Sequence, residues 1–213
     1  MSDSIEPHLT AEQRAVWLSL DSPARIQAFL DAIPYSAEDA NRSPLQVLQD
    51  RQAHCLDGAL FAAAALRRLG RSPIIVDLLP EPGLDDDHVL AIFKRDGFYG
   101  ALAKSNFAGL RYREPIHRTY RELVFSYFED FFNVHGVKTL RAYTAAVNLA
   151  SFDKLNWMTR STGADAIEKR LKELKRIPLM PDYLARDLLP MDERAYQAGM
   201  LGANAAGLYK PQR

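Results

Sequence analysis

Residues 55–103 read CLDGALFAAAALRRLGRSPIIVDLLPEPGLDDDHVLAIFKRDGFYGALA, and this stretch decides the fold. Its first part, 55–69, is rich in Ala and Leu and predicts a helix, with Gly70 as a left-handed cap. Residues 73–79 are a β-branched run, and 87–94 alternate between two faces, so both predict strands. Asp96-Gly97 predicts a hairpin turn, with 98–103 as the returning strand. The sequence therefore predicts an α+β core of helix, strand and hairpin.

Helical patterns flank this core on both sides. Capping signals at Thr10, Ser22-Pro23 and Ser43-Pro44 predict three helix starts. After about residue 115, apolar spacing predicts helices over 119–133, 138–149 and 164–176. We therefore expect N-terminal helices over 1–42 packed on the core, a core over 43–114, and a helical C-terminal region over 115–213, all in one compact domain.

Composition excludes several classes of protein. The 213 residues carry 27 Lys+Arg and 27 Asp+Glu, so the chain lacks the basic excess that nucleic-acid binding requires. No apolar run approaches the ~20 residues that span a bilayer, and the acidic start does not resemble a signal peptide. A single cysteine suits a reducing compartment. We expect a cytoplasmic protein with no membrane or nucleic-acid partner and no cofactor.

Cys55 and His88 are the residues with the most chemical interest. Cys55 opens a helix, where the exposed amides and the helix dipole favour a thiolate; alternatively it is a small buried core residue. His88 begins a strand expected to lie against that helix; alternatively it is a surface histidine. If Asp96-Gly97 form a two-residue loop, paired positions sum to 193, so His88 faces Ser105, with Asn106 beside it. One of those two polar side chains could orient the imidazole.

The order of these features resembles the transglutaminase-like core of bacterial cysteine hydrolases over about residues 43–114. The resemblance rests on the Cys55 helix with its Ala-Leu-Arg-Arg-Leu-Gly continuation at 65–70 and on His88 before the hairpin. Where the family usually has an aspartate on the next strand, this chain has Lys104-Ser105-Asn106.

The resemblance implies a papain-like Cys-His-Asn triad with no metal. Cys55 is the expected nucleophile, His88 the base, and Asn106, or else Ser105, the residue that orients the base. The Cys55 backbone N–H and the side chain of Gln52, with Gln49 second, are the expected oxyanion donors. His54 is expected to be structural.

The expected function is thiol-dependent acyl transfer on an amide bond of a peptide or small amide, either by hydrolysis (peptidase or amidase) or by transfer to an amine, as in transglutaminases. One alternative is a non-catalytic scaffold or interaction protein with the same core. Another is a metal site formed by Cys55, His88, His54 and an acid from residues 85–87.

Overall fold

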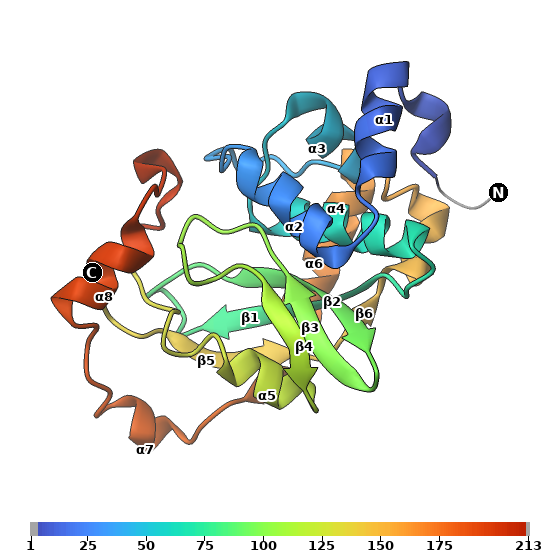
Figure 1. Ribbon diagram of the computed structural model, residues 1–213. Coiled ribbons are helices and arrows are strands. Elements are labelled where there is room, and N and C mark those ends of the chain that lie inside the picture. The colour runs from blue at the N-terminus through green and yellow to red at the C-terminus, as the bar shows by residue number, and fades with distance from the viewer. Residues whose placement is uncertain (1–3, 212–213) are drawn as a thin grey trace.

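The computed structural model describes residues 4–211 and has one antiparallel sheet with helices on both faces (Figure 1). Its strands follow the order β4-β3-β2-β1-β5-β7, and the short β6 pairs with β1 beside β5. The strands are β1 (Ile74–Pro80), β2 (His88–Arg95), β3 (Phe98–Leu102), β4 (Arg113–His117), β5 (Leu140–Thr144), β6 (Val147–Asn148) and β7 (Arg176–Pro178).

The α-helices lie mostly before the sheet and after it in sequence. They are α1 (Ala11–Ser19), α2 (Pro23–Ala32), α3 (Pro44–Asp50), α4 (Cys55–Arg68), α5 (Tyr120–Phe125), α6 (Ser161–Glu173), α7 (Asp182–Ala185) and α8 (Glu193–Met200). Short 3-10 helices are η1 (Glu6–His8), η2 (Leu149–Leu155) and η3 (Ala205–Gly207). None of the helices within residues 4–211 has the length and apolar character needed to cross a membrane.

The predicted helix starts are confirmed by their caps. Thr10 and Ser43 each form a capping box with the glutamine three residues later, and Ser22 accepts from the amide of Arg25. Gly70 has a φ of 76°, which is the left-handed conformation expected where α4 ends. These local signals decide the structure because each satisfies backbone groups that a helix end leaves without partners.

The predicted hairpin is confirmed in register but is shorter than expected. Arg95 pairs with Phe98, and Ala91 pairs with Leu102, so the sum of 193 holds along the ladder. The pairing ends there, and His88 instead faces Leu78 of β1. The predicted pairing of position 88 with position 105 is therefore wrong, because β3 ends at Leu102.

One predicted helix in the C-terminal half is wrong, and another is confirmed only over its first part. The segment 138–149 contains β5, which pairs with Leu78 and Leu79 of β1, so tertiary pairing overrides a helical pattern. The segment 119–133 is helical only over α5 and then continues as turns. The helix predicted over 164–176 corresponds to α6. The region 115–213 thus supplies strands to the central sheet as well as helices.

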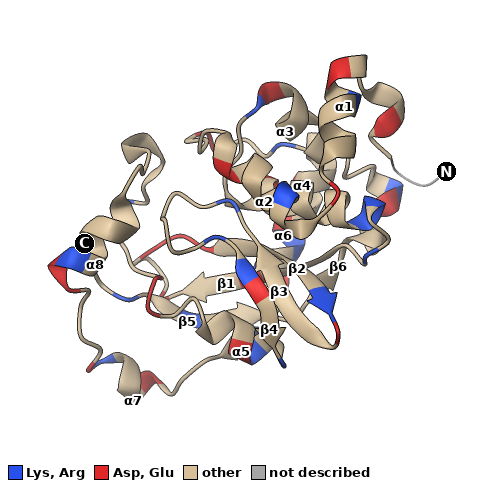
Figure 2. Cartoon of the chain, in the orientation of Figure 1, with Lys and Arg blue, Asp and Glu red and all other residues tan. Residues whose placement is uncertain are grey.

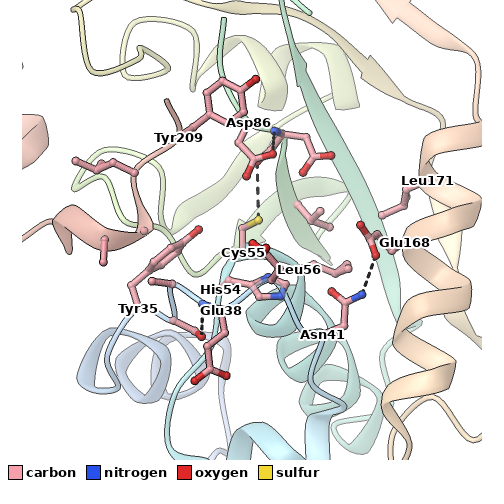
Figure 3. A pocket seen from close by; sticks show the side chains of 18 of the residues that line it. Tyr35, Glu38, Asn41, His54, Cys55, Leu56, Asp86, Glu168, Leu171 and Tyr209 are labelled. Atoms are coloured by element: carbon pink, nitrogen blue, oxygen red, sulfur yellow. Dashed lines mark hydrogen bonds between the residues drawn. The ribbon is translucent and has the colours of Figure 1, made fainter. Parts of the chain in front are cut away.

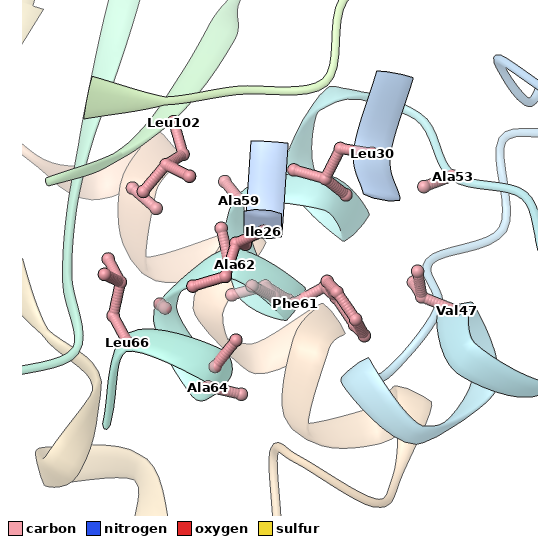
Figure 4. Packing of buried hydrophobic residues seen from close by; sticks show 14 of the residues in the cluster. Ile26, Leu30, Val47, Ala53, Ala59, Phe61, Ala62, Ala64, Leu66 and Leu102 are labelled. Carbon is pink, nitrogen blue, oxygen red and sulfur yellow. The ribbon is translucent and has the colours of Figure 1, made fainter. Parts of the chain in front are cut away.

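The two faces of the sheet bury separate apolar layers. Helix α4 packs on β2, where Val89, Ala91 and Phe93 point toward it, and α2, α3 and α6 surround α4 (Figure 4). The opposite face, with Leu90 and Ile92, is covered by α5 and the aromatic residues that follow it. The side of β2 on which a residue lies therefore decides which layer it joins.

Charged residues of both signs are spread over the described part of the chain (Figure 2).

Candidate functional site

Cys55 lies at the first turn of α4, as predicted. Its side chain is 8% exposed, and its sulfur lies 3.8 Å from the backbone oxygen of Asp87, just before β2. His54 is the residue before the helix, and Asp57 accepts a hydrogen bond from the His54 backbone amide (3.2 Å). This capping arrangement fixes the end of α4, and with it the position of the thiol.

A cleft of about 780 Å³ opens over Cys55 (Figure 3). Its walls are formed by the loop before α3, the acidic loop before β2, helix α6 and the C-terminal segment 206–210. Carboxylates outnumber lysines on these walls, so the cleft favours a cationic group. The carboxylates are Glu38, Asp39, Asp86, Asp87 and Glu168, and the lysines are Lys172 and Lys210.

The thiol of Cys55 is held in its protonated form. Burial raises its pKa well above the ordinary value, and the negative charges of Asp87, Asp86 and Asp77 raise it further. A hydrogen bond from the backbone of Val89 acts in the opposite direction. The expectation that the helix start favours a thiolate is therefore not supported, because desolvation and the neighbouring carboxylates raise the thiol pKa.

His88 lies on the face of β2 opposite to the one that α4 covers. Its Nε2 is 2.8 Å from the backbone oxygen of Leu110, and its ring packs edge-on against Tyr127 and Phe131. Burial lowers its pKa to about 4, so the ring is neutral near pH 7. The structure therefore does not bring His88 to Cys55, since the imidazole belongs to the other apolar layer.

Asn106 and Ser105 line the same small cavity as His88, but their hydrogen bonds go to other partners. The side-chain oxygen of Asn106 accepts from the amide of Asn204 (2.7 Å), and its Nδ2 donates to the Asn204 backbone oxygen (2.9 Å). Ser105 accepts from the amide of Phe107 (3.0 Å). The oxygen and the nitrogen of the Asn106 side-chain amide thus both bind the C-terminal segment. The sequence had predicted that this side chain contacts His88 instead.

The predicted oxyanion donors are separated. Gln52 is half-buried in the loop between α3 and α4 and does not line the cleft, and Gln49 is exposed at the end of α3. Tyr35 lines the cleft with Cys55, whose backbone lowers the pKa of the Tyr35 hydroxyl against the larger raising effect of burial. Tyr35 thus lies near the residue whose amide is an expected oxyanion donor.

His54 is the site residue that sequence reasoning missed. It lines the same cleft as Cys55 (Figure 3), and its Nε2 lies 3.2 Å from Oδ1 of the buried Asp57. Burial lowers the pKa of His54 to about 4 and raises that of Asp57 to about 7. Arg42 also donates its backbone amide to Asp57 (2.6 Å). The available signal was the spacing of His54, Cys55 and Asp57, a helix-capping pattern that also aligns an imidazole with a carboxylate.

The alternative metal site does not form. Across residues 4–211, His, Cys, Asp and Glu side chains nowhere gather in a group of three or more that could hold a metal ion. Cys55 begins α4, whereas His88 points from the face of β2 that α4 does not cover, which explains why the four proposed ligands do not converge.

Comparison with known proteins adds no family to these observations. The chain matches neither a protein-family model nor a curated protein.

Proposed function

We propose that the cleft over Cys55 carries out thiol-dependent acyl transfer on an amide bond, with water or an amine as the final acceptor. The observation that carries this proposal is the common location of Cys55 and the His54–Asp57 pair at one helix end, under an open cleft. Nucleophile, imidazole and carboxylate are the components of a cysteine triad, which is recognised by geometry and not by order in the sequence.

In this proposal His54 is the base. Its Nε2–H donates a hydrogen bond to Oδ1 of Asp57 throughout, so Nδ1 is the ring nitrogen that takes the thiol proton. The sulfur then attacks the substrate carbonyl, a C–S bond forms, and the carbonyl electrons move to oxygen. When the oxyanion collapses, the amine departs with the proton from His54. Water or a second amine then attacks the thioester and returns Cys55 as a thiol.

Tyr35 has a part in this cycle. Its side chain lines the cleft with Cys55, and we expect a substrate carbonyl to displace it on the way to the Cys55 amide. Once displaced, the phenol can donate to the same oxyanion. In this proposal the protonated thiol is the resting form, and substrate entry both moves Tyr35 and excludes water from the acidic groups nearby.

His88 and Asn106 were the expected partners of Cys55, and neither is favoured in this role. For His88 to reach the thiol, its ring would have to leave the pocket of Tyr127 and Phe131 and give up its bond to Leu110. A buried ring with a satisfied hydrogen bond is expensive to remove. We therefore expect His54 to matter more than His88 for the chemistry.

The test is acylation of the full chain by p-nitrophenyl acetate. Mass spectrometry of the intact protein is expected to show one acetyl group in the wild type and none in Cys55→Ser. The matched pair His54→Ala and His88→Ala identifies the base: we expect at least a hundredfold loss of acylation rate in the first and a loss below tenfold in the second, provided both remain folded by circular dichroism. Acylation that survives in Cys55→Ser would contradict the proposal, and a loss confined to His88→Ala would make His88 the base.

A second candidate function is a non-catalytic scaffold that uses the same cleft for binding. The specific observation in its favour is the acidic surrounding of Cys55, which opposes thiolate formation. This candidate predicts that no acyl-enzyme accumulates and that the thiol reacts with iodoacetamide only at alkaline pH, with no difference between wild type and His54→Ala.

A further inference from the structure

The C-terminal segment closes one side of the Cys55 cleft. After α8 the chain returns toward the loop that precedes α3 (Figure 1). Asn204 is bound through its backbone N–H and C=O by the single side chain of Asn106, at 2.7 and 2.9 Å. Its own Nδ2 donates to the backbone oxygen of Tyr35 (3.1 Å). We call residues 204–210 the tail; its first residue is thus bound at three points.

Residues 206–210 then form part of the cleft wall. Gly207 and Tyr209 line both this cleft, in which Figure 3 labels Tyr209, and a smaller cavity that His88 also lines. Gly207 lies flat against Tyr35: a Cβ on residue 207 would come within 3.0 and 3.1 Å of the tyrosine ring. The tail can follow this path because residue 207 has no side chain.

The tail is held by hydrogen bonds and has little apolar anchoring. Neither α8 nor η3 contains a buried residue, and Asn204, Ala205, Ala206 and Lys210 are exposed. Segments with few buried apolar contacts open locally at low free-energy cost. The segment can therefore leave the cleft while the sheet and α4 remain folded.

We propose that the surface under residues 204–210 is a binding site for a peptide segment, which the chain's own tail occupies in cis with a short 3-10 turn at Ala205–Gly207. The inference rests on the proposed function in that it names the substrate class of the same cleft. Asn106 binds only the N–H and C=O of residue 204, groups that every peptide carries. Tyr35 favours a glycine three residues later, because a Cβ there would lie only 3.0 and 3.1 Å from its ring, and the acidic cleft wall favours a lysine at the position of Lys210.

This assignment gives Asn106 a role that a triad does not explain. Asn106 binds the backbone N–H and C=O of one residue at the same time, and so recognises a peptide segment by its main chain. The covalent link to the rest of the chain gives the tail an effective concentration of about millimolar, so a peptide in trans competes poorly until the tail is released.

The test uses the full chain with Cys55→Ser, so that binding is measured without acyl chemistry. The probe is a fluorescein-labelled peptide with the sequence of residues 203–211, ANAAGLYKP. Adding Gly207→Val to the protein prevents the tail from seating against Tyr35, and the peptide is then expected to bind at least tenfold tighter than to the Cys55→Ser protein alone, by fluorescence polarisation. Ala205→Val is the matched control, because it adds bulk at an exposed neighbour and should leave the affinity unchanged.

Two further results complete the test. A peptide that carries Gly207→Val should bind the released protein at least tenfold more weakly, and Asn106→Ala in the released protein should have a similar effect. Chymotrypsin should cut at Leu208 or Tyr209 faster in Gly207→Val than in wild type. Equal peptide affinity in the released and unreleased proteins, or no binding to either, would overturn the inference. Because the probe binds a protein without the thiol, failure of the acylation test leaves this result unaffected.

Discussion

Cys55 and His88 belong to neighbouring elements but point into different layers of the molecule. The sulfur of Cys55 contacts the backbone of Asp87, directly before His88, whereas the imidazole of His88 bonds Leu110 on the far side of the sheet. Cys55, at the start of α4, and His88, at the start of β2, are therefore separated by the backbone of that strand. For this reason the cysteine's chemical environment is set by carboxylates, and the histidine's by aromatic rings.

The first prediction concerns the reactivity of the Cys55 thiol. After burial itself, Asp87 is the strongest influence raising the pKa of Cys55, and burial holds the pKa of Asp87 at about 7. At pH 8 the Asp87 carboxylate is charged, so Asp87→Asn should lower the thiol pKa and raise its alkylation rate about three- to tenfold. Iodoacetamide labelling followed by mass spectrometry measures the rate. Asp96→Asn, at the exposed hairpin turn, is the control and should have no effect; equal rates in all three proteins would show that carboxylate charge does not govern the thiol.

The second prediction is a dependence of stability on pH that comes from His88. Its pKa falls from 6.5 to about 4 on folding, so the folded state binds fewer protons than the unfolded state between these values. The contribution of His88 is therefore complete above about pH 6.5 and is lost as the pH falls toward 4. We expect the free energy of unfolding, measured with urea, to fall between pH 7 and pH 4.5 in both proteins. The fall should be smaller by about 2–3 kcal/mol in His88→Leu than in wild type.

The exposed His8 provides the control for that measurement. His8→Leu should keep the wild-type difference between the two pH values. His54 and the buried carboxyl groups also titrate in this range, but they are present in all three proteins and cancel in the comparison. An identical pH dependence in His88→Leu and wild type would mean that the ring is not buried as a neutral group.

The sequence predicted those parts of the fold that depend on local signals. The capping serine Ser43 and the turn at Asp96-Gly97 act within a few residues, and both are found as expected. The strand at Leu140–Thr144 was not predicted, because its structure comes from pairing with β1, sixty residues earlier. Alternation correctly grouped His88 with Leu90 and Ile92, but which face α4 would cover depends on tertiary packing.

The candidate site was predictable to the same extent. The place of Cys55 at a helix start follows from residues 53–57 alone, whereas its pKa depends on aspartates that the fold brings from two other segments. The position of Asn106 beside Asn204 could not be foreseen, since nearly a hundred residues separate them and the tail makes few apolar contacts.

The third prediction concerns Asp57, the carboxylate behind His54. It is fully buried and accepts from the backbone amides of Arg42 and His54, so Asp57→Ala leaves both amides without a partner. We expect a loss of about 3 kcal/mol or more in the free energy of unfolding. Asp50 contacts the same arginine, but its side chain is 47% exposed, so Asp50→Ala should cost less than about 1 kcal/mol. Urea unfolding measures both variants. Similar losses in their free energies of unfolding would show that Asp57 does not stabilise this helix end more than an exposed carboxylate does.

The last prediction concerns the contact of Gly58 with Lys104, which sets how closely α4 approaches the chain after β3. A Cβ on residue 58 would lie 2.2 Å from the Cβ of Lys104. Lys104 cannot move aside, because its Nζ donates to the backbone oxygens of Leu30 and Ile33 at the end of α2. Gly58→Ala should therefore destabilise the protein by about 2–3 kcal/mol, although alanine is the better helix former by about 1 kcal/mol.

A double-mutant cycle separates this clash from any other effect of the alanine. Lys104→Gly removes the atom that the new Cβ meets, so Gly58→Ala should cost about 1–2 kcal/mol less in that background than in wild type. Urea unfolding of the four proteins gives the coupling. A coupling near zero would mean that the two backbones can separate without loss, and the position of Cys55, one turn before Gly58 on the same helix, would then be less rigid than the packing of α4 implies.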